Sequence, residues 1–168
     1  MGTVAAISGK PELFRLKHFD VAIIDEATQI LEPQLLGILC ARGEDGKDAI
    51  DKFVLIGDHK QLPAVVQQNT EQSAIYDESL LSIGLTNLKD SLFERLYRNC
   101  TATVHRSYDM LCRQGRMHPE VALFANRAFY GGRLIPVGLP HQIESSDTIC
   151  RLVQCLDLIR IFAPGTQD

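Results

Sequence analysis

Residues 21–29, Val-Ala-Ile-Ile-Asp-Glu-Ala-Thr-Gln, decide the fold class of this 168-residue chain. An apolar run without alternation is typical of a strand that is covered on both faces in a parallel sheet. Asp25 and Glu26 follow this run directly, so two carboxylates leave the sheet at its carboxyl edge, where open α/β sheets bind ligands. The stretch predicts an α/β protein whose acid pair can hold Mg²⁺ and orient water for phosphoryl transfer.

The same acid pair also has a purely structural interpretation. Asp25 could cap a following helix, with Glu26 in its first turn, because the N-terminal end of a helix favours carboxylates. The pair alone does not distinguish this role from a site.

A second apolar run, residues 53–56, ends in the polar turn Gly57-Asp58-His59-Lys60-Gln61. Residues 33–42 between the two runs predict a helix with one apolar face, formed by Leu35, Leu36 and Leu39. Strand, helix and strand at this spacing predict a right-handed βαβ unit. Parallel strands would then bring Asp25, Glu26, Asp58 and Gln61 to one edge, and Gly57 permits a tight exit or a close backbone approach. An ordinary polar loop is the alternative for residues 57–61.

A third segment, Gln114-Gly115-Arg116-Met117-His118-Pro119, precedes a predicted helix over residues 120–130, because Pro119 suits a helix start. The apolar face of that helix comprises Val121, Phe124, Ala125, Ala128 and Phe129. Together with residues 25–29 and 57–63, this order resembles the superfamily 1 helicases. Ser-Leu-Phe-Glu-Arg-Leu at 91–96 and Phe-Tyr-Gly-Gly-Arg-Leu at 129–134 resemble their up-frameshift-like branch, and the resemblance extends over residues 2–134.

The resemblance implies a partial RecA-like fold and a role for each matched residue. Asp25 would position Mg²⁺ on the β- and γ-phosphates of ATP, and Glu26 would polarise the hydrolytic water. Gln61 would sense the γ-phosphate, and Arg116 would reach from the second domain to stabilise charge on it. Asp58 and Gln29 would line the cofactor site. The partner would be single-stranded DNA or RNA, along which the protein would move 5′ to 3′.

Two departures from the family pattern bear on nucleotide binding. Gly115 occupies the position where family members often carry an aromatic residue that stacks on adenine. Tyr97 and Tyr108 could replace it, but packing is the more common role of an aromatic ring. The chain also contains no Gly-x-x-x-x-Gly-Lys-Ser/Thr loop, which would cradle the phosphates. We therefore expect an internal piece of a longer helicase that hydrolyses little ATP alone.

The composition, with 45% hydrophobic and 23% charged residues, fits a globular chain without a membrane segment or signal peptide. Five cysteines without paired C-x-x-C spacing indicate reduced thiols in the cytoplasm. A zinc site from Cys100, His105, Cys112 and His118 is the weaker interpretation, because the spacing fits no common finger. The net charge of −4 argues against strong nucleic-acid binding by the chain alone, although arginines gather at Arg106, Arg113, Arg116, Arg127 and Arg133.

The motifs predict two parts: residues 1–112, from the first RecA-like domain, and residues 113–168, from the second. We expect strands at 3–7, 104–112 and 150–158, a surface loop at 67–86, and an amphipathic helix that uses Leu88, Leu92, Phe93 and Leu96 and extends through Asn99. Two other functions stay open: a non-catalytic interaction module, and a metal-dependent phosphohydrolase that uses Asp25, Glu26 and Asp58.

Overall fold

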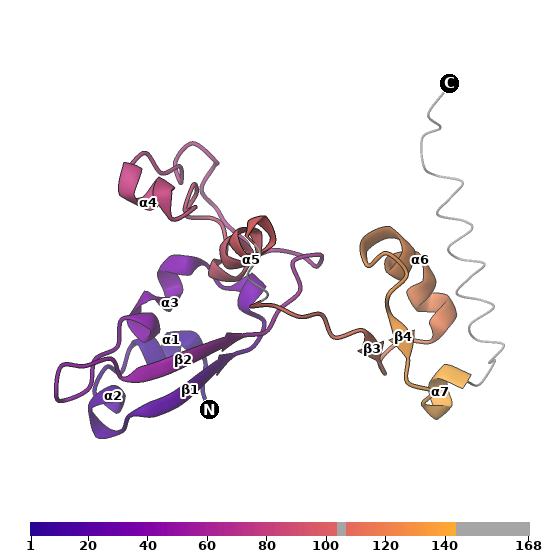
Figure 1. Ribbon diagram of the computed structural model, residues 1–168, viewed down its shortest axis with the longest axis horizontal. Helices are drawn as coiled ribbons and strands as arrows, with labels where there is room; N and C mark the ends of the chain where they lie inside the picture. Colours follow the sequence, from indigo (N-terminus) through magenta and orange to yellow (C-terminus); the bar gives the residue numbers. More distant parts are fainter. Residues whose placement is uncertain (104–106, 144–168) are drawn as a thin grey trace. The chain divides into compact units, whose positions relative to one another are not determined.

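The computed structural model describes residues 1–103 and 107–143 (Figure 1). The chain divides into two compact units, residues 1–108 and 109–168. The expected division lay between residues 112 and 113, and the assignment of the two units to two RecA-like domains stays a prediction. No helix within the described ranges is long and apolar enough to cross a membrane.

The first unit has a mixed α/β architecture, as the sequence predicted. Its elements are α1 (Val4–Ser8), α2 (Leu13–Leu16), β1 (Phe19–Ile24), the 3₁₀ helix η1 (Ala27–Gln29), α3 (Glu32–Leu39), β2 (Ile50–Leu55), α4 (Glu78–Ser82) and α5 (Leu92–Ala102). The second unit contains β3 (Arg113–Gln114), α6 (Pro119–Phe129), β4 (Ile135–Pro136) and α7 (Pro140–Ile143).

Strands β1 and β2 pair in parallel, from Phe19 beside Ile50 to Ile24 beside Leu55. Helix α3 connects them, so the predicted strand–helix–strand unit is confirmed. Helices α1 and α3 lie along one face of the sheet (Figure 1). The core on that face is formed by Leu35, which is fully buried, together with residues that include Ile24, Ala27, Ile38, Ile50 and Leu92.

The sequence predicted that both faces of the strands are covered, but the described residues cover only one face. Val21, Ile23 and Val54 are 46%, 68% and 45% exposed. Their apolar character therefore marks a sheet face that no described element covers.

The strand expected at residues 3–7 is wrong, because this segment forms helix α1. The Thr3 hydroxyl accepts a hydrogen bond from the Ala6 backbone N–H at 3.2 Å, which satisfies a donor at the helix start. Val4 and Ile7 then pack against the buried core. Local capping and packing outweigh the strand preference of the β-branched residues in this segment.

Helix α3 covers residues 32–39 rather than 33–42. Leu36 was expected on its buried face but is 50% exposed, and Ile38 takes part in the core instead. The expected surface loop at 67–86 contains the short helix α4, because the Asp77 carboxylate caps it by accepting hydrogen bonds from the N–H groups of Ser79 and Leu80.

Helix α5 begins at Leu92, because the Ser91 hydroxyl accepts from the Glu94 N–H at 3.1 Å and caps it. Leu88 therefore lies outside this helix. Arg95 links α5 to α3 through a bidentate ion pair with Glu32. Its Nε and Nη2 donate to the two carboxylate oxygens at 2.8 and 2.5 Å. Both side chains are only 11% exposed.

In the second unit, β3 pairs in parallel with β4, and α6 lies between them in the chain. The helix predicted after Pro119 is confirmed, but its expected apolar face is open, with Phe124 73% and Phe129 51% exposed. Residues 107–112 form no strand, contrary to expectation. The expected strand at 150–158 and residues 104–106 lie outside the described residues.

Candidate nucleotide-phosphate site

Asp25 and Glu26 leave β1 at its carboxyl end, and both are exposed. Glu26 has φ 51° and ψ 36°, the left-handed conformation, and is the one non-glycine residue with positive φ within the described ranges. This backbone costs an L-residue about 1–2 kcal/mol. Such strain gathers at functional sites, where the surrounding structure maintains it.

Two local hydrogen bonds hold Glu26 in this conformation. Its N–H donates to Asp25 Oδ1 at 2.9 Å, and its carbonyl accepts from the Gln29 N–H at 2.9 Å. The Glu26 side chain makes no capping bond to η1, and the Asp25 carboxylate binds its neighbour's amide rather than a helix start. The helix-capping interpretation of the acid pair is therefore wrong.

The exit of β2 contacts the exit of β1 directly. The Ile56 N–H donates to the Ile24 carbonyl and the Ala27 N–H donates to the Ile56 carbonyl, each at 2.8 Å. A Cβ on Gly57 would lie 2.9 Å from Thr28 Cγ2 and 3.0 Å from the Thr28 backbone nitrogen. The predicted close backbone approach at Gly57 is confirmed, and it brings the two polar turns together at one edge.

Asp58 organises the turn that carries Gln61. Its carboxylate accepts from the Lys60 N–H at 2.9 Å and from Gln61 Nε2 at 3.0 Å, and its carbonyl accepts from the Gln61 N–H at 3.1 Å. Asp58 is half-buried whereas Gln61 is exposed. Within this chain Asp58 thus orients Gln61. The sequence predicted only that Asp58 would line the cofactor site, and that role stays a prediction.

An aromatic cluster of His59, Phe93, Tyr97 and Tyr108 anchors the same turn. The rings of His59 and Tyr97 are 4.2 Å apart at 32°, and Tyr97 also contacts Phe93 at 6.5 Å and Tyr108 at 5.1 Å. Tyr97 and Tyr108 therefore pack on protein rings, which is the structural alternative to stacking on adenine. Sequence reasoning missed this cluster, because nothing in the sequence signals that α5 reaches the turn at His59.

Arg116 lies in the second unit, on a turn fixed by two glutamines. Gln114 bonds both the N–H and the carbonyl of Met117 at 2.9 Å. Gln142, which is buried, donates to the carbonyls of Gln114 and Met117 at 3.0 and 2.9 Å. Arg116 itself is exposed. Its role opposite Asp25 stays a prediction, and Gln142 is a supporting residue that the sequence analysis missed.

Gly115 has a packing reason for lacking a side chain. A Cβ there would lie 3.0 Å from Leu139 Cδ1 and 3.3 Å from Val137 Cγ2. A side chain at this position would require the Leu139 and Val137 side chains to shift. The packing around Gly115 is thus tight on the side where a Cβ would lie.

Gln29, the remaining expected site residue, ends η1 and is exposed. Its role in the cofactor site stays a prediction. Cys100, Cys112 and His118 form no metal-binding group in the described part of the chain, and the fourth expected member, His105, lies outside it. His118 instead caps α6, with Nδ1 accepting from the Glu120 N–H at 3.3 Å.

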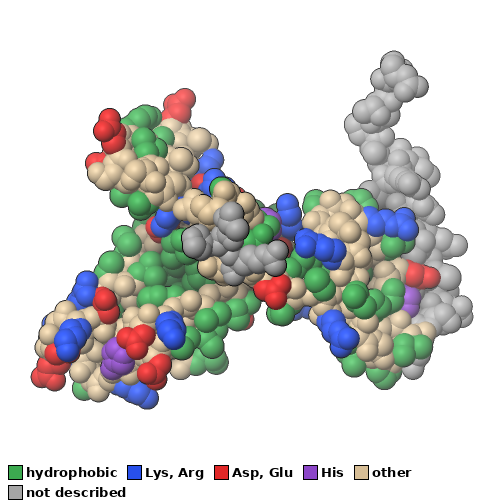
Figure 2. All heavy atoms as spheres, viewed as in Figure 1, with side chains coloured by type: hydrophobic (Ala, Val, Ile, Leu, Met, Phe, Trp, Pro, Cys, Tyr) green, Lys and Arg blue, Asp and Glu red, His purple; other side chains and the backbone are tan. Residues whose placement is uncertain are grey.

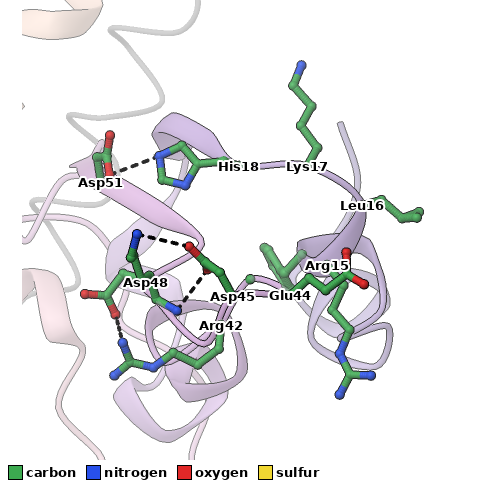
Figure 3. A pocket seen from close by; sticks show the side chains of 12 residues that line it. Arg15, Leu16, Lys17, His18, Arg42, Glu44, Asp45, Asp48 and Asp51 are labelled. Carbon is green, nitrogen blue, oxygen red and sulfur yellow. Dashed lines mark hydrogen bonds and ion pairs between the residues drawn. The ribbon is translucent and has the colours of Figure 1, made fainter.

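A cavity of about 810 Å³ lies at the other end of the sheet, around His18, Arg42 and Asp48 (Figure 3). Figure 2 shows charged and histidine side chains gathered over that end of the first unit, at the lower left. The acid pair lies instead on an open edge. We locate the candidate phosphate site at the acids, because ligand chemistry follows the ends of parallel strands rather than the volume of a hollow.

Comparison with known proteins agrees with this geometry. Two family models, each described as an AAA domain, match residues 2–69 and 88–154. The chain is similar to the DNA replication ATP-dependent helicase/nuclease DNA2 of Gallus gallus, with 35% identity over 123 residues, or 73% of this chain and 10% of that protein. The probable helicase MAGATAMA 3 of Arabidopsis thaliana shares 37% identity over 118 residues, or 70% of this chain and 12% of that protein.

An uncharacterized ATP-dependent helicase of Methanocaldococcus jannaschii shares 29% identity over 149 residues, or 89% of this chain and 17% of that protein. The chain thus spans about a tenth of the length of the first relatives that it matches. The residues matched by the two family models include all the motifs described above. The chain belongs to the superfamily 1 helicases, in their up-frameshift-like branch.

Proposed function

We propose that this chain supplies part of an ATP-hydrolysing motor that moves on single-stranded DNA or RNA. The observation that carries the proposal is the junction of the two strand exits, where the Ala27 N–H donates to the Ile56 carbonyl. This junction brings the turn of Asp25 and Glu26 against the turn that leads to Gln61. The names of the relatives, ATP-dependent helicases among them, support the same function.

The chemistry of Asp25 fits a magnesium ion. Mg²⁺ prefers oxygen ligands and keeps several of its waters, so it needs only one or two carboxylates besides the phosphates. Asp25 is an exposed carboxylate at the ligand-binding edge of the sheet. When bound, the ion would neutralise charge on the β- and γ-phosphates of ATP.

Glu26 acts on the attacking water. A carboxylate at this position accepts a hydrogen bond from the water and orients it toward the γ-phosphate. The strained backbone at Glu26 supports this role, because residues held in strained conformations cluster at functional sites.

Gln61 reports the presence of the γ-phosphate. A primary amide has two N–H donors, and the Asp58 carboxylate accepts from Nε2 at 3.0 Å. With one N–H bonded to Asp58, the second N–H of the same amide would donate to the γ-phosphate. We assign Gln29 to the same edge, and in the complete helicase Arg116 would stabilise charge on the γ-phosphate.

The sequence contains no Gly-x-x-x-x-Gly-Lys-Ser/Thr motif, the glycine-rich loop that would cradle the phosphates. Positioning is the main source of catalysis in phosphoryl transfer. We therefore expect the isolated chain to hydrolyse little or no ATP. The cysteine composition supports a cytoplasmic setting for the whole protein.

The test is ATP turnover by the complete helicase that contains this segment. Glu26→Gln should abolish turnover stimulated by single-stranded nucleic acid while nucleotide binding is kept. Glu44→Gln, an exposed glutamate in the same unit, is the matched control and should leave turnover unchanged. Undiminished turnover by the Glu26→Gln protein would contradict the role of Glu26. Strong ATP hydrolysis by the isolated chain would contradict the need for the missing loop.

A further inference from the structure

A second group of ligand-type side chains lies at the end of the sheet opposite the acid pair. His18 comes just before β1, Asp20 lies on β1 and Asp51 lies on β2. Phe19 pairs with Ile50 and Val21 with Lys52, so Asp20 and Asp51 occupy matching positions on adjacent strands. We propose that His18, Asp20 and Asp51 bind a divalent transition metal ion such as Zn²⁺.

The distances suit such an ion. One donor atom from each of the three residues lies within 4.8 Å of the other two. A metal with bonds of about 2.1 Å holds its donors about 3.0–3.4 Å apart. His18 Nε2 and Asp51 Oδ1 are already 3.1 Å apart, so at most the Asp20 carboxylate has to move closer. All three side chains are exposed, which gives them the rotamer freedom for that movement.

The donor set discriminates between metals. One imidazole nitrogen and two carboxylates match the mixed nitrogen and oxygen ligands of Zn²⁺ and its neighbours, whereas Mg²⁺ favours oxygen ligands alone. The site is also built on paired strands, so the backbone fixes the spacing of Asp20 and Asp51. Two carboxylates directly opposite on adjacent strands repel each other, and a bound cation relieves that repulsion.

The cavity beside this group leaves space for the remaining ligands of the metal. His18 and Asp51 line the 810 Å³ cavity, and Figure 3 shows their side chains directed toward each other at its border. The neighbouring carboxylates Asp45 and Asp48 are engaged elsewhere, with Lys47 and Arg42. Three protein ligands with open positions are typical of zinc sites that also bind water or a substrate.

The experiment is a titration of the 168-residue chain with Zn²⁺ and with Co²⁺, followed by calorimetry and by the visible spectrum of cobalt. We expect one site that prefers both ions to Mg²⁺. His18→Ala and Asp51→Asn should each weaken binding by at least about tenfold, since a direct ligand matters at least as much as an outer-shell partner. Asp20→Asn should weaken it in the same way. Asp48→Asn removes a carboxylate of the same cavity outside the group, so it is the matched control and should bind normally. Circular dichroism of each variant checks that it is folded.

Three results would overturn the proposal. They are the absence of binding at millimolar metal, binding that His18→Ala leaves unchanged, and a thiolate-to-cobalt absorption band. The last would assign the ion to cysteines such as Cys40, Cys100 or Cys112, which are free thiols in the described chain.

Discussion

Replacing Glu26 with glycine should stabilise the chain while it destroys the proposed catalytic group. The left-handed backbone at Glu26, with φ 51°, costs a residue with a Cβ about 1–2 kcal/mol, and glycine adopts it without that cost. Glycine also gains more freedom in the unfolded chain, which offsets about 0.5–1 kcal/mol. Taking the middle of each range, the net expectation is a gain of about 0.8 kcal/mol in the free energy of unfolding, or roughly 3–6 °C in Tm.

Urea denaturation followed by tyrosine fluorescence measures this change. The chain has no tryptophan, and three of its four tyrosines, Tyr76, Tyr97 and Tyr108, lie in the first unit with Glu26. Glu26→Gln and Glu26→Ala are the controls, because both keep the Cβ and therefore the strain. If the glycine variant is no more stable than these two, the left-handed conformation at Glu26 is not a source of strain, and its use as evidence for function fails.

Three further predictions concern the packing and charges of the first unit. Arg95→Met should cost about 3–5 kcal/mol in the free energy of unfolding, because it leaves the Glu32 carboxylate buried without its charged partner. A loss below about 1 kcal/mol in urea denaturation would show that this ion pair is dispensable. Gly57→Ala should cost about 1–3 kcal/mol by the same assay, because the new Cβ would clash with Thr28. Thr28→Ser in the Gly57→Ala protein should recover only part of the loss, since the Thr28 backbone nitrogen stays in place. Full stability of Gly57→Ala alone would refute the close approach. The hydrogen bond that the His18 ring donates to the Asp51 carboxylate raises the pKa of His18 above its ordinary value of about 6.5. The stabilisation by this pair is therefore complete below pH 6.5 and is lost as the pH rises through the raised pKa. Proton NMR titration should show this pKa, Asp51→Asn should lower it, and an identical pKa in both proteins would contradict the pairing.

The sequence predicted the parts of the fold that depend on local pattern. The apolar runs that end in Asp25 and Asp58 are strands, and they pair in parallel around α3. The helix after Pro119 also follows its prediction. In each case the hydrophobic period and the turn residues agree, so the local and the tertiary preferences point the same way.

The failures have tertiary or capping causes. Residues 3–7 look like a strand, but the Thr3 cap and the packing of Val4 and Ile7 make them a helix. Leu36 belongs to an apolar pattern yet remains exposed, because Leu35 and Ile38 already fill the core. Short polar helices such as α4 depend on one capping side chain, Asp77, which a hydrophobic pattern does not show.

The candidate site was predictable in its residues but not in its supports. Asp25, Glu26 and Gln61 follow from the strand ends and the family resemblance. The left-handed backbone of Glu26, the Asp58–Gln61 bond and the ring contact of His59 with Tyr97 depend on three-dimensional packing. No spacing rule in the sequence reveals contacts between residues 59 and 97.

The most direct test of the account is the crystal structure of the complete helicase with Mg²⁺ and a non-hydrolysable ATP analogue. We expect the γ-phosphate at the edge formed by the ends of β1 and β2, with Asp25 at the ion or one of its waters. Gln61 should lie within hydrogen-bond distance of the γ-phosphate, and Arg116 should approach it from the other side. A nucleotide bound away from that edge, for example in the cavity beside His18, would contradict the central claim.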